Sequence, residues 1–396
     1  MTATLTPAQE AARMVDSLGP EALAKAQAYT TGGHWVLLGG VLVTVLVAVI
    51  MVRLRLLDRI AARFAEPRRF GPTLVVSAAF LVISTLIALP WTLYTDWHRE
   101  RAFGLSSQPL GDFLGQMALS EAISTALGAL FLAGVYALIR KTGKRWWMWS
   151  GGFAGGVTLL ALLAGPPLIE PLFNEYKPVP PGEVRTALEE IAEDVDIPKD
   201  RIFLYDGSRQ SDRFTANVSG IGPSARIAIS DVALKQASLA EVRAVTGHEA
   251  GHYKLGHVWR YVVIFPLLAM LFFFLLDRLF APTARALGSD ASLDEPRGLP
   301  VFAVVGAVLG LLVTPLTNTL TRVGEAEADH YSLVTVNEPD ALATALVKTA
   351  EYRYPRPSAL EEALFYTHPP VEKRALRAME WKAAHPKAEA PSAAAP

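Results

Sequence analysis

The chain has 396 residues, 51% of them hydrophobic, and a mean hydropathy of +0.28, which is typical of a membrane protein rather than of ordinary soluble domains. The formal net charge of −1 indicates no strongly basic or acidic surface, so we expect no nucleic-acid partner. Because the sequence has no cysteine, disulfide bonds and thiolate ligands are excluded, and any bound metal must be held by His, Asp or Glu.

The chain begins with charged residues and continues with long apolar runs. Residues 1–34 carry charges ahead of any apolar run, unlike a secretory signal, and we interpret them as an amphipathic N-terminal segment. Apolar windows of about 18 residues or more then predict six membrane-spanning helices. These helices are predicted at residues 35–52, 72–95, 113–139, 147–169, 258–280 and 299–320.

The apolar runs do not have the pattern of helices in a soluble core. HWVLLGGVLVTVLVAVIMV and YVVIFPLLAMLFFFLL carry no charge and no polar face at helical spacing. Glu121 and Asn318 fall inside two predicted spans, where each needs a polar partner or water. We therefore expect a cavity or a helix-bundle interior at these positions rather than a lipid-facing surface.

Residues 170–257, between the fourth and fifth spans, have the pattern of a soluble α+β domain. RIFLYDG predicts one strand, and FTANVS and ARIAIS predict two strands joined through the turn residues GIGPS. A helix is predicted from Ser238, because SLAE is a capping-box pattern with Glu241 three residues after the cap. The segment AVTGHEAGHYKLGHVWR continues this helix.

On that helix, His248 and His252 are four residues apart, so both imidazoles leave the same face and can bind one metal ion. Glu249 is turned about 100° away from His248, where it suits a general base that takes a proton from water. A zinc ion would lower the pKa of that water toward about 7. The alternative, a helix with two surface histidines, is favoured only if no third ligand exists.

A catalytic zinc site needs a third ligand and leaves its fourth position open. The segment TRVGEAEADHYS, 321–332, follows the last span and predicts a helix on which Glu325 and Asp329 share a face, whereas Glu327 points elsewhere. We predict Glu325 as the ligand. Asp329 could bind the outer nitrogen of a ligating histidine or assist proton transfer. Without the two histidines, this segment would be interpreted as a solvated acidic helix.

These segments resemble the type I CaaX prenyl endopeptidase family, integral-membrane zinc metalloproteases related to the heat-shock membrane proteases. The resemblance spans most of residues 72–378 and rests on the zinc helix, the third-ligand helix and a C-terminal signature. The corresponding stretches are HEAGHYKLGH, TRVGEAEADHYS and THPPVEKR, with ALPWTLYTDWHRERAFGLSSQPLGDF and PLIEPLFNEYKPVPPGE in the membrane domain.

The resemblance implies one zinc ion per chain and a role for each matching residue. His248, His252 and Glu325 would bind zinc, Glu249 would be the general base, Asp329 a proton donor, and His368 and Arg374 would stabilise the oxyanion of the tetrahedral intermediate. Without the resemblance, His368 before two prolines is typical of a surface turn. His257 also matches a family position, where we expect it to support the helix end or the membrane interface rather than the metal.

The resemblance further implies that a peptide substrate adds as an extended strand to the sheet edge beside the zinc helix. Relatives usually have Asn-Ala at the start of that strand, whereas this chain has Thr215-Ala216. The family encloses a water-filled chamber within seven membrane helices, against the six predicted here. We therefore expect an α-helical membrane bundle of six to seven helices with an inserted α+β metalloprotease domain, acting on membrane-anchored substrates in contact with the lipid bilayer.

The predicted organisation has six segments. They are the amphipathic segment 1–34, four membrane helices at 35–169, the metalloprotease domain with the zinc helix at 170–257, two membrane helices at 258–320, the third-ligand helix and the C-terminal part of the catalytic domain at 321–382, and a disordered tail at 383–396. The tail is small, Pro-rich and polar.

Orientation and substrate stay open at the level of sequence. The short loops at 53–71 and 140–146 hold ten Lys and Arg residues, and the positive-inside rule then places the zinc domain outside the cytoplasm, whereas the resemblance implies the cytosolic side. CaaX processing of prenylated proteins is the family's namesake reaction. Quality-control cleavage of membrane proteins is the alternative, and a zinc-dependent scaffold or transporter without hydrolysis is a third possibility that the intact Glu249 disfavours.

Overall fold

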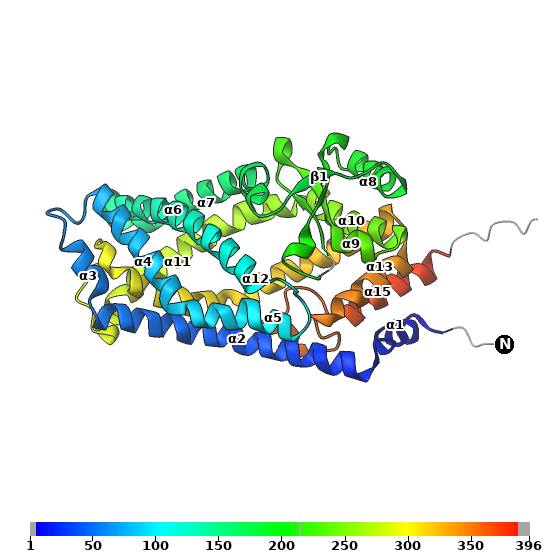
Figure 1. Ribbon diagram of the computed structural model, residues 1–396, viewed down its shortest axis with the longest axis horizontal. Coiled ribbons are helices and arrows are strands. Elements are labelled where there is room, and N and C mark those ends of the chain that lie inside the picture. The colour runs from blue at the N-terminus through cyan, green and yellow to red at the C-terminus, as the bar shows by residue number, and fades with distance from the viewer. Residues whose placement is uncertain (1–4, 214, 387–396) are drawn as a thin grey trace, which may run out of the picture.

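The computed structural model describes residues 5–213 and 215–386 of the chain. The molecule is elongated, with a bundle of long helices at one end and a smaller α+β domain at the other (Figure 1). The described helices are α1 Pro7–Asp16, α2 Gly19–Arg53, α3 Leu56–Ala61, α4 Phe70–Thr92, α5 Arg99–Ala102, α6 Leu110–Thr142, α7 Trp146–Ala164, α8 Glu183–Asp194, α9 Asp231–Gln236, α10 Leu239–Lys254, α11 His257–Leu287, α12 Leu299–Thr335, α13 Pro339–Lys348, α14 Ala359–Phe365 and α15 Val371–Ala384.

Five helical segments are long and apolar enough to cross a membrane. They are Gly19–Arg53, Phe70–Ala102, Leu110–Leu172, His257–Leu287 and Pro296–Thr335. The third of these contains two helices, α6 and α7, which are separated by a short turn. Four of the six apolar runs found in the sequence lie within single helices, α2, α6, α11 and α12. The runs at 72–95 and 147–169 continue from α4 and α7 into the π-helical segments Leu93–His98 and Gly165–Ile169.

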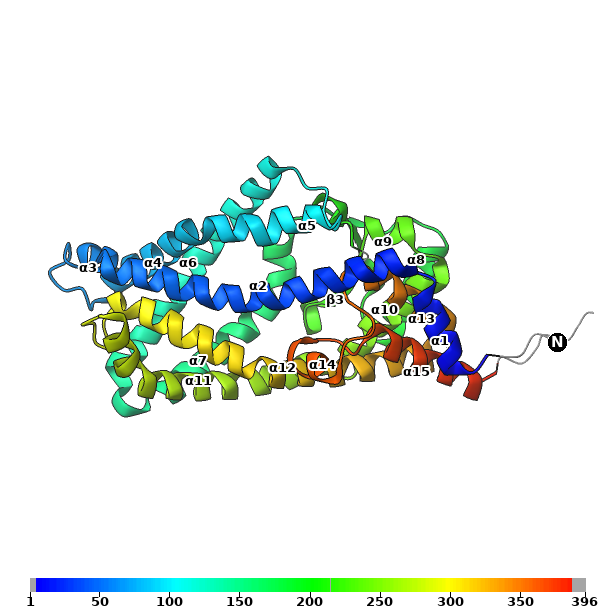
Figure 2. The same cartoon turned by 90° about the horizontal axis from the view of Figure 1, so that it is seen from below.

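The described part of the predicted N-terminal segment consists of α1 and the first part of α2. Thr6 caps helix α1 in a capping box with Gln9, and the buried Ala11 and Val15 of this helix pack against α15. Helix α2 then runs unbroken from Gly19 to Arg53, so residue 34 lies within a helix (Figure 2). Figure 2 shows α2 running along the molecule until it reaches α1.

The α+β domain contains a four-stranded mixed sheet in the order β1-β2-β4-β3. Its strands are β1 Tyr176–Pro178, β2 Ile202–Tyr205, β3 Ala216–Ser219 and β4 Arg226–Ser230. Strands β1 and β3 pair antiparallel with their neighbours, whereas β2 and β4 are parallel. The three strands predicted from the sequence are confirmed, and β1 was missed. Strand β3 lies at one edge of the sheet.

Helix α10 joins the two parts of the molecule. On one side, Val242 and Ala250 pack with β4 and α8 in the core of the α+β domain. On another side, α10 packs along the last turns of α12, the helix that leaves the bundle (Figure 1). The prediction that 321–332 forms a helix is confirmed, and this helix is the continuous end of the 37-residue α12. Any site built on α10 and α12 therefore lies where the α+β domain meets the membrane bundle.

Candidate metal centre and active site

The start of α10 sets the position of its histidines. Ser238 caps the helix as predicted, and Glu241 completes the capping box while it also binds Lys348 of α13 at 2.8 Å. Gly247 and Gly251 face α12, and a Cβ atom at Gly247 would lie 2.5 Å from Val336. The two glycines therefore allow α10 to lie close against α12, which brings His248 and His252 toward that helix.

Three donor groups converge between α10 and α12. The Nε2 atoms of His248 and His252 are 3.2 Å apart, and they lie 3.3 and 3.4 Å from the two carboxylate oxygens of Glu325. The donor atoms of all three residues lie within 4.8 Å of one another, a spacing that can hold a metal ion. Among the described residues, Glu325 Oε2 is buried without a hydrogen-bond partner. Two imidazoles and one carboxylate with such an orphaned oxygen fit a metal ion.

The outer nitrogen of His248 faces Asp329. His248 Nδ1 lies 2.9 Å from Asp329 Oδ1, and Arg374 donates to both Asp329 oxygens at 2.7 and 2.6 Å. Burial by itself lowers the pKa of His248, but the contacts with Asp329 and Glu325 outweigh it and raise the pKa to about 10. Asp329 therefore takes the first of its two predicted positions, beside a histidine that faces the metal site.

His252 is held by a different chain of contacts. Its Nδ1 lies 2.8 Å from His257 Nδ1, and His257 Nε2 lies 2.9 Å from Glu327, which also accepts from Arg260. Glu327 points away from the donor cluster, as predicted. His257 fixes the ring of His252 and lies outside the group of converging donor atoms.

Glu249 lies beside the donor cluster and lines a cleft of about 200 Å³. Burial raises the pKa of its carboxyl group, and the neighbouring His248 and His252 oppose that rise. The cleft extends from Thr215 and Ala216 of the β3 edge to His368 and Arg374. An extended peptide in this cleft would therefore lie between a free sheet edge and the donor cluster.

His368 and Arg374 both reach the cluster from the C-terminal segment. His368 Nε2 lies 3.3 Å from Glu325 Oε1, and Arg374 Nη2 lies 3.5 Å from Glu325 Oε2. Burial and the neighbouring Arg353 lower the pKa of His368 to about 3, so its imidazole is neutral at physiological pH. Arg374 is almost fully buried in its bidentate pair with Asp329. All seven residues predicted for the site are thus brought together.

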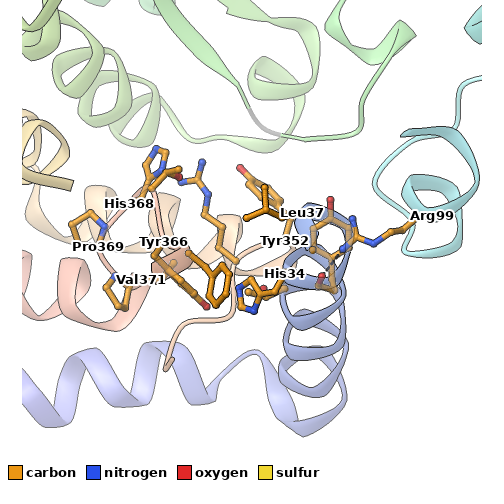
Figure 3. A pocket seen from close by; sticks show the side chains of 15 residues that line it. His34, Leu37, Arg99, Tyr352, Tyr366, His368, Pro369 and Val371 are labelled. Carbon is orange, nitrogen blue, oxygen red and sulfur yellow. Dashed lines mark hydrogen bonds between the residues drawn. The ribbon is translucent and has the colours of Figure 1, made fainter. Parts of the chain in front are cut away.

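A second cavity of about 290 Å³ adjoins the cleft. It shares Tyr352, Arg353 and His368 with the cleft and reaches His34 of α2. Figure 3 shows His368 on one side of this cavity, with Tyr352 and His34 between it and Arg99. Sequence reasoning missed Tyr352 and Arg353, because an arginine between two tyrosines in EYRYPRP matches no catalytic motif.

Comparisons with known proteins agree with this geometry. The family model described as peptidase family M48 matches residues 178–382, and the one described as the CAAX prenyl protease N-terminal domain, with five membrane helices, matches residues 4–175. A CAAX prenyl protease 1 homolog of Arabidopsis thaliana is 30% identical over 313 residues, which cover 78% of this chain and 73% of that protein. The uncharacterized metalloprotease YhfN of Bacillus subtilis is 28% identical, with 71% of this chain and 66% of that protein covered.

The fold has a counterpart among solved structures. The crystal structure of S. mikatae Ste24p matches with a TM-score of 0.76 at 23% identity, over 92% of this chain and 90% of that one. The two family models together account for the helical bundle and the α+β domain. The chain therefore belongs to peptidase family M48 and is an integral-membrane metalloprotease.

Proposed function

We propose that this protein is a zinc endopeptidase that cleaves peptide bonds of membrane-anchored substrates. The observation that carries the proposal is the convergence of His248, His252 and Glu325 on one point, with Glu249 beside it at the wall of a cleft. Two imidazoles and one carboxylate form a ligand set typical of catalytic zinc, with the fourth position open. A bound zinc ion would activate water and polarise the scissile carbonyl group.

The residues around the cluster have separate roles in this proposal. Glu249 takes the proton from the attacking water and passes it to the leaving amine, since it lies at the cleft wall. Asp329 orients His248 and balances its charge, and Arg374 holds Asp329 in place. Because Asp329 does not line the cleft, we assign it the role of orienting His248 rather than that of donating a proton to the substrate.

His368 is the group best placed to stabilise the oxyanion. Its imidazole lines the cleft, and its low pKa leaves it neutral with one N–H to donate. Arg374 also lines the cleft, but its Nε and Nη2 atoms already donate hydrogen bonds to Asp329. We therefore assign oxyanion stabilisation to His368 first, with Arg374 contributing through its charge.

The proposed substrate is a peptide that adds to the β3 edge while attached to the membrane. The names of the relatives suggest CaaX-type removal of C-terminal residues from prenylated proteins. Cleavage of membrane proteins in quality control is the second candidate, because the cleft lies where the α+β domain meets the bundle. A zinc-binding scaffold without hydrolysis is disfavoured by a carboxylate at the position of Glu249.

We also propose that the metal-binding domain, with the boundaries predicted from the sequence, faces the cytoplasm, as the family resemblance implies. The basic loops at the opposite end favour the reverse orientation. Because the chain has no natural cysteine, one cysteine introduced at Ser208 reports the orientation by labelling with an impermeant maleimide in intact cells. Labelling of intact cells would show that the domain lies outside the cytoplasm.

The test of the proposed function is metal content together with cleavage of a peptide panel in detergent. We expect about one zinc per chain in both the wild type and Glu249→Gln, and cleavage only by the wild type. Prenylated and unprenylated versions of each peptide identify the substrate class. A wild-type protein that binds zinc but cleaves nothing beyond what Glu249→Gln cleaves would support the scaffold.

A further inference from the structure

The cavity beside the cleft has a one-sided set of charges. Its charged lining residues are the cations Arg99 and Arg353, and Arg99 is paired with Glu100 at 3.8 Å. Burial lowers the pKa of His368, so this side chain contributes a neutral imidazole to the lining, and His34 adds a second imidazole. The lining contains no Asp and no Glu. In a site of low polarity, such a cavity favours an anionic group of a ligand. Its volume of about 290 Å³ is near the lower end for small-molecule pockets, which suits a short chain end.

Arg353 differs from the other arginines around the site. Arg374 is paired with Asp329 at 2.6 Å, and Arg213 is paired with Glu100 at 2.6 Å. Within the described residues, the guanidinium of Arg353 has no ion pair and no side-chain hydrogen bond, although it is only partly exposed. It lies over the ring of Tyr352, 5.3 Å from the ring centroid, and Arg213 lies 5.0 Å from the same centroid. A partly buried cation without a carboxylate is costly unless a ligand supplies one.

Arg353 also lies where the two cavities meet. Tyr352, Arg353 and His368 line both the cleft that holds Glu249 and the adjoining cavity. A peptide that lies in the cleft past His368 therefore also meets Arg353, which lines the cleft and the adjoining cavity alike. A peptide segment has only one fixed anion that is independent of its side chains, the α-carboxylate at its C-terminal end.

We propose that Arg353 binds the C-terminal carboxylate of the substrate, and that the adjoining cavity holds the last residues after the scissile bond. The proposal rests on the proposed function and adds to it the residue that recognises the chain end of the substrate. Guanidinium and carboxylate form bidentate, charge-assisted hydrogen bonds, which give geometric specificity as well as affinity. The enzyme would then measure its cleavage position from the end of the substrate.

The experiment compares one peptide with a free C-terminal carboxylate and the same peptide as a C-terminal amide. We expect the wild type to cleave the acid roughly 10- to 100-fold more efficiently in kcat/KM, mainly through KM. Arg353→Gln should lower this preference to near unity, and Arg353→Lys should restore part of it. Lengthening the peptide by one residue at its C-terminus should move the cleavage site by one residue in the wild type but not in Arg353→Gln.

Arg356→Gln is the matched control, three residues away. Arg356 is paired with Glu372 at 2.6 Å and Asp16 at 2.7 Å, and it lies outside both cavities. This variant should keep the wild-type preference for the acid, and zinc content should be unchanged in all variants. Equal cleavage of acid and amide by the wild type would overturn the carboxylate proposal while the protease assignment stands. If the wild type cleaves neither of these two peptides and none of the panel peptides, that result would instead count against the proposed function.

An anionic lipid headgroup is the other source of an anion for Arg353. The assay is therefore repeated in neutral detergent and with added phosphatidylglycerol. If Arg353 binds a lipid phosphate, Arg353→Gln will change cleavage of acid and amide equally, and the change will depend on the anionic lipid. That result would replace the peptide carboxylate as the ligand. An effect confined to the acid, with or without the lipid, supports the proposal.

Discussion

The two ends of the molecule both contain clustered charges, but they differ in how those charges are satisfied. At the end remote from the metal centre, Arg297 binds Asp58 and Glu295, each at 2.8 Å. Arg140 donates to Thr73 at 3.1 Å and to the backbone oxygen of Asp294. These contacts join loops between helices, and each cation has several protein partners.

At the metal centre, Asp329 and Arg374 are paired with each other, but the three proposed ligands point at one another without satisfying one another. The Nε2 atoms of His248 and His252 lie 3.2 Å apart, and Glu325 Oε2 is a buried acceptor without a donor among the described residues. Matched charges stabilise a fold, whereas convergent and unmatched groups are typical of a site that binds a ligand. The structural cluster and the functional cluster therefore differ in whether their groups have hydrogen-bond partners, not in how much charge they contain.

The largest expected effect is the loss of the metal. Glu325→Ala removes one of the three proposed ligands and leaves the two histidines without a carboxylate, so we expect zinc content and peptide cleavage to fall to background. Metal analysis and cleavage assays on the purified protein measure both. If Glu325→Ala keeps full zinc occupancy and activity, the site lies elsewhere and the comparison of the two ends fails.

The next effect concerns Asp329, which contacts both His248 and Arg374. Asp329→Asn removes a charge beside the imidazole and unpairs Arg374, so we expect zinc affinity to fall by roughly 10- to 100-fold. Competition with a chelator measures this affinity. Glu327→Gln, at the corresponding contact of His257, is the matched variant, with a smaller expected loss because Glu327 is farther from the ligand. Equal losses would remove the distinction between the two supporting contacts.

Metal uptake should also depend on pH. The pKa of His248 is raised to about 10 in the metal-free protein, so this imidazole carries a proton below that pH and must release it to bind zinc. The apparent zinc affinity should therefore rise with pH, about tenfold per unit, until the pH approaches 10. When the wild type is titrated with zinc in weak buffer at pH 8, it should release about one proton per zinc bound. The Asp329→Asn variant should release clearly less.

The smallest expected effect lies at the remote end. Arg297→Gln removes ion pairs with Asp58 and Glu295 that are partly exposed, so we expect a loss of roughly 1–2 kcal/mol in stability and a fall of a few degrees in Tm. Zinc content and kcat/KM should be unchanged. A loss of zinc in this variant would show that the two ends are coupled and that charge pairing alone does not separate them.

The sequence by itself determined the membrane character, the helices and the residues that we propose as the ligand set. Long apolar runs form helices because backbone groups in lipid must be satisfied internally, and His248 and His252 share a face because of helical spacing. The capping box at Ser238 located the start of α10 for the same local reason. Glu325 was found because it follows a membrane span at a position that shares a face with Asp329.

Tertiary structure alone decided which contacts surround those residues. The pairing of Asp329 with Arg374, and of His252 with His257, joins residues on different elements whose spatial relation no local pattern encodes. The position of Arg353 between two cavities likewise depends on how the segment after α13 packs against α2 and the cleft. Periodicity and capping act within a few residues of the chain, whereas the matching or exposure of a charge is set by packing between distant segments.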